Sequence, residues 1–383
     1  MTGDLGCHVT LLAGATVPVP LPPDLTARVV SVTVTESDHD RSAFTVVLDA
    51  GRSGPLGALD TPVLGPTSPL RPGSRVVVVL TTGVVPHVLA DGIVTETELT
   101  PGSTASAAEL RVTGHDLSVL LDRRERSAEH VALEDSLQAL AIAAGYAVHG
   151  VAPLVVPPAD LDPPLPIERT PTQQGTDWSH LQLLARRHGY VCCMVPGPFP
   201  GLSTLYWGPP VREGLPQPAL AVDCGPATNV IGALRFREDA LTPEVQEGRV
   251  MDRRTGVTLP VRTVAPLRVP QTAMPTWATH AGDVRVRQFR DSGVGAVTAF
   301  ARAQATTDRA ADAVTCDGML DGAVYGDVLR PRALVGLRGA GWSHDGLWYV
   351  RRVVHQVRPG AWTADFSLTR DGLGSTVPVV RVR

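Results

Sequence analysis

The chain has 383 residues and a formal net charge of −4 at pH 7. This negative balance argues against a dedicated nucleic-acid binder and against a protein that binds an anionic membrane surface. The 37 glycines and 34 prolines, with only 4% aromatic residues, favour a loop-rich β protein over a helical bundle.

Alternating apolar residues predict antiparallel strands in the first third of the chain. Residues 26–49 give two strands, one with Val30, Val32 and Val34 in alternation and the other with Phe44, Val46 and Leu48. Further strands are expected at 75–80, 87–99 and 108–116, separated by turn residues. An antiparallel barrel or sandwich is the natural arrangement for them.

The pattern then becomes helical. Residues 133–146 have helical period, with Gly145 near the end and one face shared by Leu133, Leu137, Leu140, Ala141 and Ala144. After the middle of the chain, residues 240–285 carry several prolines and little clear period, so we expect an irregular insertion there. An Ala-rich helix, a strand near 314–319 and three strands between 332 and 370 complete the predicted elements.

The stretch GTDWSHLQLLARRHGYVCC, residues 175–193, combines two histidines with paired cysteines and could therefore suggest a chemical site. Helical period instead places Trp178, Leu181, Leu184, Ala185 and His188 on one face. Thr176 or Asp177 can cap the helix, Gly189 ends it, and residues 190–195 form a short buried strand. His180 and His188 are about 80° apart around the helix, so they lack the i, i+4 placement of a metal pair. We interpret the stretch as structural.

Other candidate sites are weak. The five cysteines are scattered, which predicts reduced, mostly buried thiols in a cytoplasmic protein rather than a secreted disulfide framework. No zinc spacing, phosphate-binding loop or dinucleotide fingerprint is present, so we expect no metal, no cofactor and no catalytic residue. The start of the chain lacks the positive segment of a signal peptide, and no apolar run approaches the length of a membrane span. Ser343, His344 and Asp345 are consecutive, whereas triad members come from separate segments; a polar hairpin tip is the better interpretation.

Two segments far apart in the chain resemble each other. Residues 70–114 begin LRPGSRVVVVL and residues 329–372 begin LRPRALVGLRG, and both continue through a strand, a loop, a strand, a Pro-Gly turn and a strand. The spacing from Leu70 to Pro101 nearly equals that from Leu329 to Pro359. Such ordered self-similarity predicts two related β domains in one chain. Arg332 stands where the first copy has Gly73, which leaves the geometry of that turn open.

Four segments together resemble the hub proteins of contractile tails, the late control protein D family, which also forms the hub part of VgrG-type spikes. They are residues 110–126, 176–190, the Ala-rich helix with the strand after it, and 346–370. The second resembles the family's T-D-x-x-x-L-x-x-L-A-x-x-x-G helix at Thr176, Asp177, Leu181, Leu184, Ala185 and Gly189, with Trp178 beside them. The fourth resembles its G-x-Y/W-x-V-x-x-V-x-H hairpin at Gly346, Trp348, Val350, Val353 and His355. For His355 we expect a packed or hydrogen-bonded side chain rather than a ligand.

The resemblance implies a mainly β fold with α+β insertions, in which two related antiparallel β-barrels like those of tube proteins are joined by a helical and mixed region. The expected domains are residues 1–125, 126–224 and 225–383. Three chains would form a ring that joins a six-fold tail tube to a three-fold spike on a separate chain, beside other baseplate proteins. Such a hub is a structural protein, not an enzyme, is assembled in the cytoplasm and becomes part of a phage tail or tail-like injection particle. Neither nucleic-acid specificity nor direct membrane binding is expected. The alternative function is a tail-associated hydrolase acting on cell-wall polymer, which would need a carboxylate pair or metal site.

Overall fold

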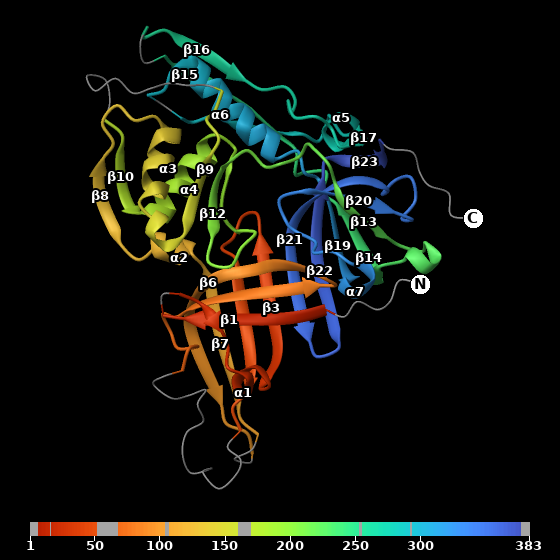
Figure 1. The fold of residues 1–383 in the computed structure, drawn as a ribbon. Coiled ribbons are helices and arrows are strands. Elements are labelled where there is room, and N and C mark those ends of the chain that lie inside the picture. Colours follow the sequence, from red (N-terminus) through yellow and green to blue (C-terminus); the bar gives the residue numbers. More distant parts are fainter. Residues whose placement is uncertain are drawn as a thin grey trace.

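A computed structural model describes residues 7–15, 17–51, 68–103, 107–159, 170–252, 255–291 and 293–376. Most of the ordered elements are strands, which confirms the mainly β fold predicted from the sequence. Figure 1 shows two β-rich parts side by side, with the helical region beside them. No helix of the described residues is long and apolar enough to cross a membrane.

The first β-rich part is built from consecutive antiparallel strands. Its elements are β1 (Cys7–Gly14), β2 (Val19–Pro20), α1 (Pro23–Thr26), β3 (Val29–Ser37), β4 (Ala43–Asp49), β5 (Arg75–Thr82), β6 (Val85–Thr100) and β7 (Glu109–Asp116). They pair in the order β3-β4-β7-β6-β5-β1. Alternate residues point inward and form one apolar core, which includes Val32, Phe44, Val78 and Val112.

The second β-rich part follows the helical region. Its elements are β13 (Gln217–Ala221), β14 (Val230–Glu238), β15 (Glu244–Met251), β16 (Thr258–Arg262), β17 (Thr272–Pro275), α5 (Thr276–Thr279), β18 (Arg285–Gln288), α6 (Ala296–Arg309), β19 (Val314–Asp321), α7 (Gly322–Tyr325), β20 (Leu334–Arg338), β21 (Gly346–Arg358), β22 (Ala361–Arg370) and β23 (Gly372–Ser375). The main strands pair in the order β14-β19-β22-β21-β20-β13 around a second core. The side chain and backbone of Asn229 hydrogen-bond to β13 next to the start of β14, which brings the two ends of this order together.

The two pairing orders are the same when β1, β3, β4, β5, β6 and β7 are matched with β13, β14, β19, β20, β21 and β22. The β5–β6–β7 and β20–β21–β22 meanders coincide with the two segments that resemble each other in sequence. One pair differs, because β1 runs antiparallel to β5 whereas β13 runs parallel to β20. The predicted internal repeat is therefore present in the strand topology.

The repeat extends to the backbone hydrogen bonds and dihedral angles of matching residues. The amide of Gly73 donates to the carbonyl of Val94, and the amide of Arg332 donates to the carbonyl of Val350, both at 2.8 Å. Both donors have a left-handed backbone, with φ of 91° for Gly73 and 65° for Arg332. The turn geometry is thus retained although Arg332 replaces a glycine. The buried guanidinium of Arg332 donates to the carbonyl of Ser37 at 2.7 Å, a contact that holds the unusual conformation in place.

A third core lies in the helical region, which separates the two β-rich parts along the sequence. Its elements are α2 (Ser118–Leu121), β8 (Glu125–Glu129), α3 (Asp135–Ala144), β9 (Val151–Val155), β10 (Thr172–Thr176), α4 (Asp177–Arg187), β11 (Val191–Pro196) and β12 (Ser203–Gly208). β9, β12 and β11 form a small sheet that α3 and α4 cover, while β8 pairs with β10.

Three sequence-based expectations are wrong. Residues 240–285 are not irregular, because β15 pairs with β16 and β18 in a three-stranded sheet that packs against α6. Val30 is half exposed because the β3–β4 pairing shifts register between Val29 and Ser31.

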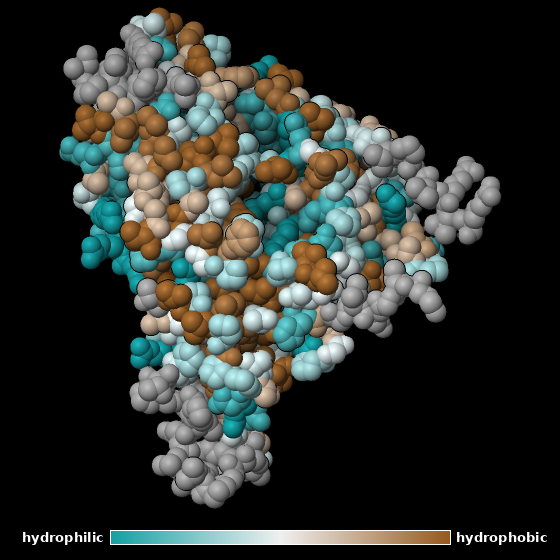
Figure 2. Space-filling model, in the orientation of Figure 1, coloured by the Kyte–Doolittle hydropathy of each residue, from teal (hydrophilic) through white to brown (hydrophobic). Residues whose placement is uncertain are grey.

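The third concerns α3, whose periodic face is turned outward. Leu137 and Leu140 are 45% and 42% exposed, whereas the buried face carries Ala139 and Ala143. The helix packs closely against β9 and α4 through these small side chains. Figure 2 shows apolar side chains gathered over this region of the surface.

Candidate functional site

Helix α4 begins at a cap predicted from the sequence. The hydroxyl of Thr176 accepts a hydrogen bond from the amide of Ser179 and donates one to Asp122 at 2.6 Å. These contacts satisfy an amide that the first turn of a helix leaves unpaired.

Asp177, the first residue of α4, is buried and fully engaged in holding the helix. Its carboxylate accepts hydrogen bonds from the hydroxyl of Tyr146 at 2.6 Å and the side-chain amide of Gln173 at 2.7 Å. The guanidinium of Arg126 lies 3.6 Å away. Burial and the nearby Asp177 carboxylate raise the pKa of Tyr146 to about 12, so its hydroxyl remains a donor at neutral pH.

The predicted apolar face of α4 is buried, as expected. Trp178, Leu181, Leu184 and Ala185 are at most 6% exposed and belong to the core of the helical region. The indole of Trp207, on β12, donates to the carbonyl of Leu181 at 3.1 Å and ties the helix to the sheet beneath it.

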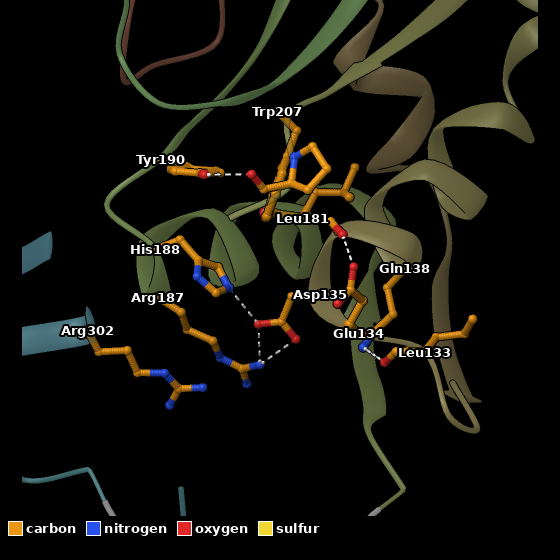
Figure 3. A network of polar contacts seen from close by, with 12 residues as sticks. Leu133, Glu134, Asp135, Gln138, Leu181, Arg187, His188, Tyr190, Trp207 and Arg302 are labelled. Atoms are coloured by element: carbon orange, nitrogen blue, oxygen red, sulfur yellow. Dashed lines mark hydrogen bonds and ion pairs between the residues drawn. The ribbon is translucent and has the colours of Figure 1, made fainter. Parts of the chain in front are cut away.

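The two histidines of α4 have separate structural partners. His180 lies 3.1 Å from the side chain of Gln138 and stacks on His130. His188 lies 3.1 Å from the carboxylate of Asp135 and packs edge-on against Trp207. Figure 3 shows the carboxylate of Asp135 facing both His188 and Arg187, with Arg302 lying beyond Arg187. The two rings do not converge on one point, and each makes its own packing and hydrogen-bond contacts.

The Asp135 cluster has a defined charge state. Burial alone would raise the pKa of the Asp135 carboxyl, but the hydrogen bond from His188 and the charge of Arg187 outweigh burial and lower it. Asp135 is therefore an ionised clamp that joins the start of α3 to the end of α4.

Gly189 ends α4 in a conformation that other residues rarely adopt. Its φ is 69°, and a Cβ placed there would lie 2.9 Å from the Cβ of Ala305 on α6. The glycine thus provides both the left-handed turn and the close approach of α6.

The adjacent cysteines point to opposite faces of β11. Cys192 packs in the core of the helical region, whereas Cys193 lies near the guanidinium of Arg332. Burial raises the pKa of both thiols, which makes them unreactive at neutral pH. All five cysteines are free thiols, as predicted.

The residues that resemble the family's G-x-Y/W-x-V-x-x-V-x-H hairpin lie on β21, and the spacing of this second signature has a structural cause. Gly346, Trp348 and Val350 are alternate buried residues, after which the pairing with β22 shifts register between Val350 and Arg352. The extra residue of this bulge returns Val353 and His355 to the buried face, which accounts for the two intervening positions in the V-x-x-V spacing.

His355 is completely buried and makes two hydrogen bonds. Its Nε2 lies 3.1 Å from the carbonyl of Leu329, and the indole N–H of Trp362 donates to its Nδ1 at 3.4 Å. A neutral ring with its proton on Nε2 satisfies both contacts. Burial lowers the pKa of His355 to about 4. The ring is packed and hydrogen-bonded, as expected, and links β21 to the second LRP turn.

Residues 342–345 lie in the loop between β20 and β21. The carboxylate of Asp345 accepts from the amide of Ala340 at 2.8 Å, while the ring of His344 stacks on Phe236 with centroids 3.9 Å apart. The carbonyl of Ser343 accepts from the buried guanidinium of Arg370. These contacts, two from side chains and one from the Ser343 backbone, support the hairpin, and the three residues are not arranged as a catalytic triad. Across the described residues there is no group of three potential metal-ligating side chains.

A cleft of about 810 Å³ opens beside the end of α4. Arg186 and Tyr190 line it from the helical region, residues 209–213 from the following loop, and Arg309 from α6. Burial and the neighbouring charge of Arg186 lower the pKa of Arg309. The cleft therefore carries adjacent positive charge on two of its walls.

An ion network that the sequence does not reveal lies on the same lining. The carboxylate of Asp312 is bound by the guanidinium groups of both Arg212 and Arg268. Burial favours the protonated acid, but the two arginines outweigh burial and lower the pKa of Asp312. The three residues come from separate parts of the chain, so no local spacing signals the network.

No family model and no curated protein matches this sequence. Solved structures do match, over nearly the whole chain. The tail protein from Neisseria meningitidis MC58 has a TM-score of 0.62 at 13% identity, over 96% of this chain and 98% of that protein. The 43 kDa tail protein of prophage MuSo2 from Shewanella oneidensis has a TM-score of 0.63 at 14% identity, over 95% and 98%. This chain has the fold of these tail proteins.

The tail-protein fold extends to a component of the type VI secretion system from Escherichia coli, with a TM-score of 0.52 at 9% identity over 90% of this chain and 73% of that one. The fold expected from the resemblance to contractile-tail hubs is thereby confirmed. Within it, the signature residues of α4 and β21 are buried structural contacts.

Proposed function

We propose that this protein is the structural hub of a contractile phage tail or of a phage-tail-like injection system. In this proposal three copies form a closed ring that connects a six-fold inner tube to a three-fold spike. Residues 1–125 and 225–383 supply the two barrel units of each copy, and residues 126–224 brace them. Strand β13, which precedes residue 225, belongs to the second unit by its pairing with β20.

The observation that carries the proposal is the repeat of one strand topology within a single chain. The pairing order and the left-handed turn after each LRP segment recur in both parts. Two similar units per chain in a cyclic trimer present six similar units to a six-fold partner while keeping true three-fold symmetry for a spike. A single-barrel chain could match the tube but would not produce this change of symmetry.

The tail-protein fold supports the same role, because proteins that share it over almost their full length are tail proteins. The proposed partners are further copies of this chain, the tube protein, the spike and other baseplate proteins.

Coexpression with the tail tube protein of the same particle tests the proposal. The expected product is a complex with three copies of this chain on one ring of six tube subunits, measured by native mass spectrometry. A complex with six copies of this chain for six tube subunits would contradict the adaptor role.

A further inference from the structure

The two β-rich parts are joined by direct strand pairing. The first half of β21 pairs with β20, but beyond Val350 that side of β21 is taken by β3. Residues 352–357 of β21 run antiparallel to residues 32–37 of β3. The second barrel unit thus continues into the first as one sheet, and Figure 1 shows β21 and β3 at the centre of the molecule.

Strand β6, the counterpart of β21 in the first unit, has the same two halves. Its first half pairs with β5 as far as Ile93, and its second half pairs with β7 as far as Thr100. It carries the same bulge, between Val94 and Glu96. Among the described residues, nothing pairs with the β5 side of residues 95–100, which are exposed. This edge corresponds to the part of β21 that β3 covers.

Strand β14, the counterpart of β3 in the second unit, has the complementary open edge. It pairs with β19 and, in the part of the chain that the structure describes, forms the end of the sheet. Its residues 231–238 are exposed or half-buried. Figure 1 shows β6 and β14 on opposite sides of the β3–β21 junction. Each chain therefore contains one complete junction and the two unpaired halves of another.

We propose that the exposed half of β6 in one copy pairs antiparallel with β14 of the next copy and so repeats the internal β21–β3 junction between chains. This inference rests on the proposed hub function, because the pairing is head-to-tail and must close into a ring. It assigns the interface to a specific pair of strands.

The repeat also fixes the register. The matching bulges equate Val354 and His355 of β21 with Glu98 and Leu99 of β6.

On the partner side, the pairings through β4 and β19 equate Thr35 and Val34 of β3 with Arg237 and Phe236 of β14. Since Val354 faces Thr35 and His355 faces Val34, Glu98 is expected to face Arg237, and Leu99 to face Phe236.

The chemistry of the two edges agrees with this register. The β6 edge carries Glu96 and Glu98, whereas the β14 edge carries Arg235 and Arg237, all exposed. In this register Glu98 faces Arg237, and opposite charges that face each other across antiparallel strands stabilise the pairing. Arg235 faces Thr100, and Glu96 lies opposite Asp239 just beyond the end of β14, so Arg235 and Glu96 are diagonal neighbours of the Glu98–Arg237 pair. Leu99 is 43% exposed in the isolated chain, and pairing with Phe236 would cover it. Like charges on each edge also oppose the pairing of β6 with β6 or of β14 with β14, which favours the head-to-tail contact.

Disulfide trapping in the full-length chain tests the pairing. The double variant Glu98→Cys with Arg237→Cys is purified reduced, oxidised at several protein concentrations and separated on a denaturing gel. We expect covalent dimers and trimers that disappear on reduction, because residues that face each other on paired strands have Cβ atoms within reach of a disulfide. Each single variant controls for the native cysteines.

A matched pair, Glu109→Cys with Arg237→Cys, controls for register, because β7 is already paired on both sides and Glu109 lies one strand further away. It is expected to give no covalent oligomer. Thermal unfolding of each reduced variant shows whether it is folded.

The outcomes separate the two proposals. Covalent trimers from the 98–237 pair alone support both. A trimeric wild-type chain whose folded 98–237 variant does not cross-link, or cross-links no better than the 109–237 pair, overturns the strand pairing but leaves the hub proposal standing. Efficient cross-linking that builds open chains well beyond three copies supports the pairing and contradicts the three-fold hub.

Discussion

Replacing His355 should change how stability depends on pH. The ring is completely buried, and its pKa is lowered from 6.5 to about 4. In the unfolded chain it takes up a proton below about pH 6.5, whereas in the folded chain it does so only near pH 4. Stability present at neutral pH is therefore lost as the pH falls between these two values.

The shift of about 2.5 pH units corresponds to roughly 3 kcal/mol when complete, of which about 2.5 kcal/mol is lost between about pH 7.5 and pH 4.5. The variant His355→Gln keeps a neutral side chain that can donate to Leu329 and accept from Trp362. Its stability should thus lack this component while retaining the contribution of every carboxylate.

The assay is urea unfolding of both proteins across this pH range. The wild type is expected to lose about 2.5 kcal/mol more than the variant. Parallel pH profiles would mean that His355 is protonated in the folded protein and would refute the assigned tautomer and burial.

Three further predictions concern the stretch 175–193. Trp178→Ala should lower the free energy of unfolding by about 3–5 kcal/mol, and a change below about 1 kcal/mol would mean that the face is not packed. Gly189→Ala should lower the free energy of unfolding by roughly 1 kcal/mol or more beyond the loss caused by Gly256→Ala. The two glycines have nearly equal positive φ, but only at Gly189 would an added Cβ lie within 3 Å of a neighbour. Equal losses in the two variants would contradict the contact with α6. Cys192 and Cys193 should react with a thiol reagent only after the protein is unfolded, and they should do so without prior reduction because they are free thiols. Rapid modification of both in the native protein would contradict their burial.

Much of this fold could be predicted from short-range patterns. Helix α4 has a cap, a periodic face and a terminating glycine within a few residues of one another, so local sequence determines its limits. The repeat was visible because both copies keep the same order of strands and turns.

Other features depend on packing between distant segments. The buried face of α3 is formed by Ala139 and Ala143, whose small size allows close approach to β9, whereas periodicity alone selects the larger Leu137 and Leu140. The strand edges that we propose as an interface become visible only when the pairing of β21 with β3 is known. No spacing within the sequence indicates which half of β6 lacks a partner on its β5 side among the described residues.

A cryo-electron microscopy reconstruction of the assembled particle tests the central claim most directly. We predict three copies of this chain at the end of the tube, each contributing two barrel units to one ring around the channel. A ring of six copies, or of copies that each contribute a single barrel, would contradict the account.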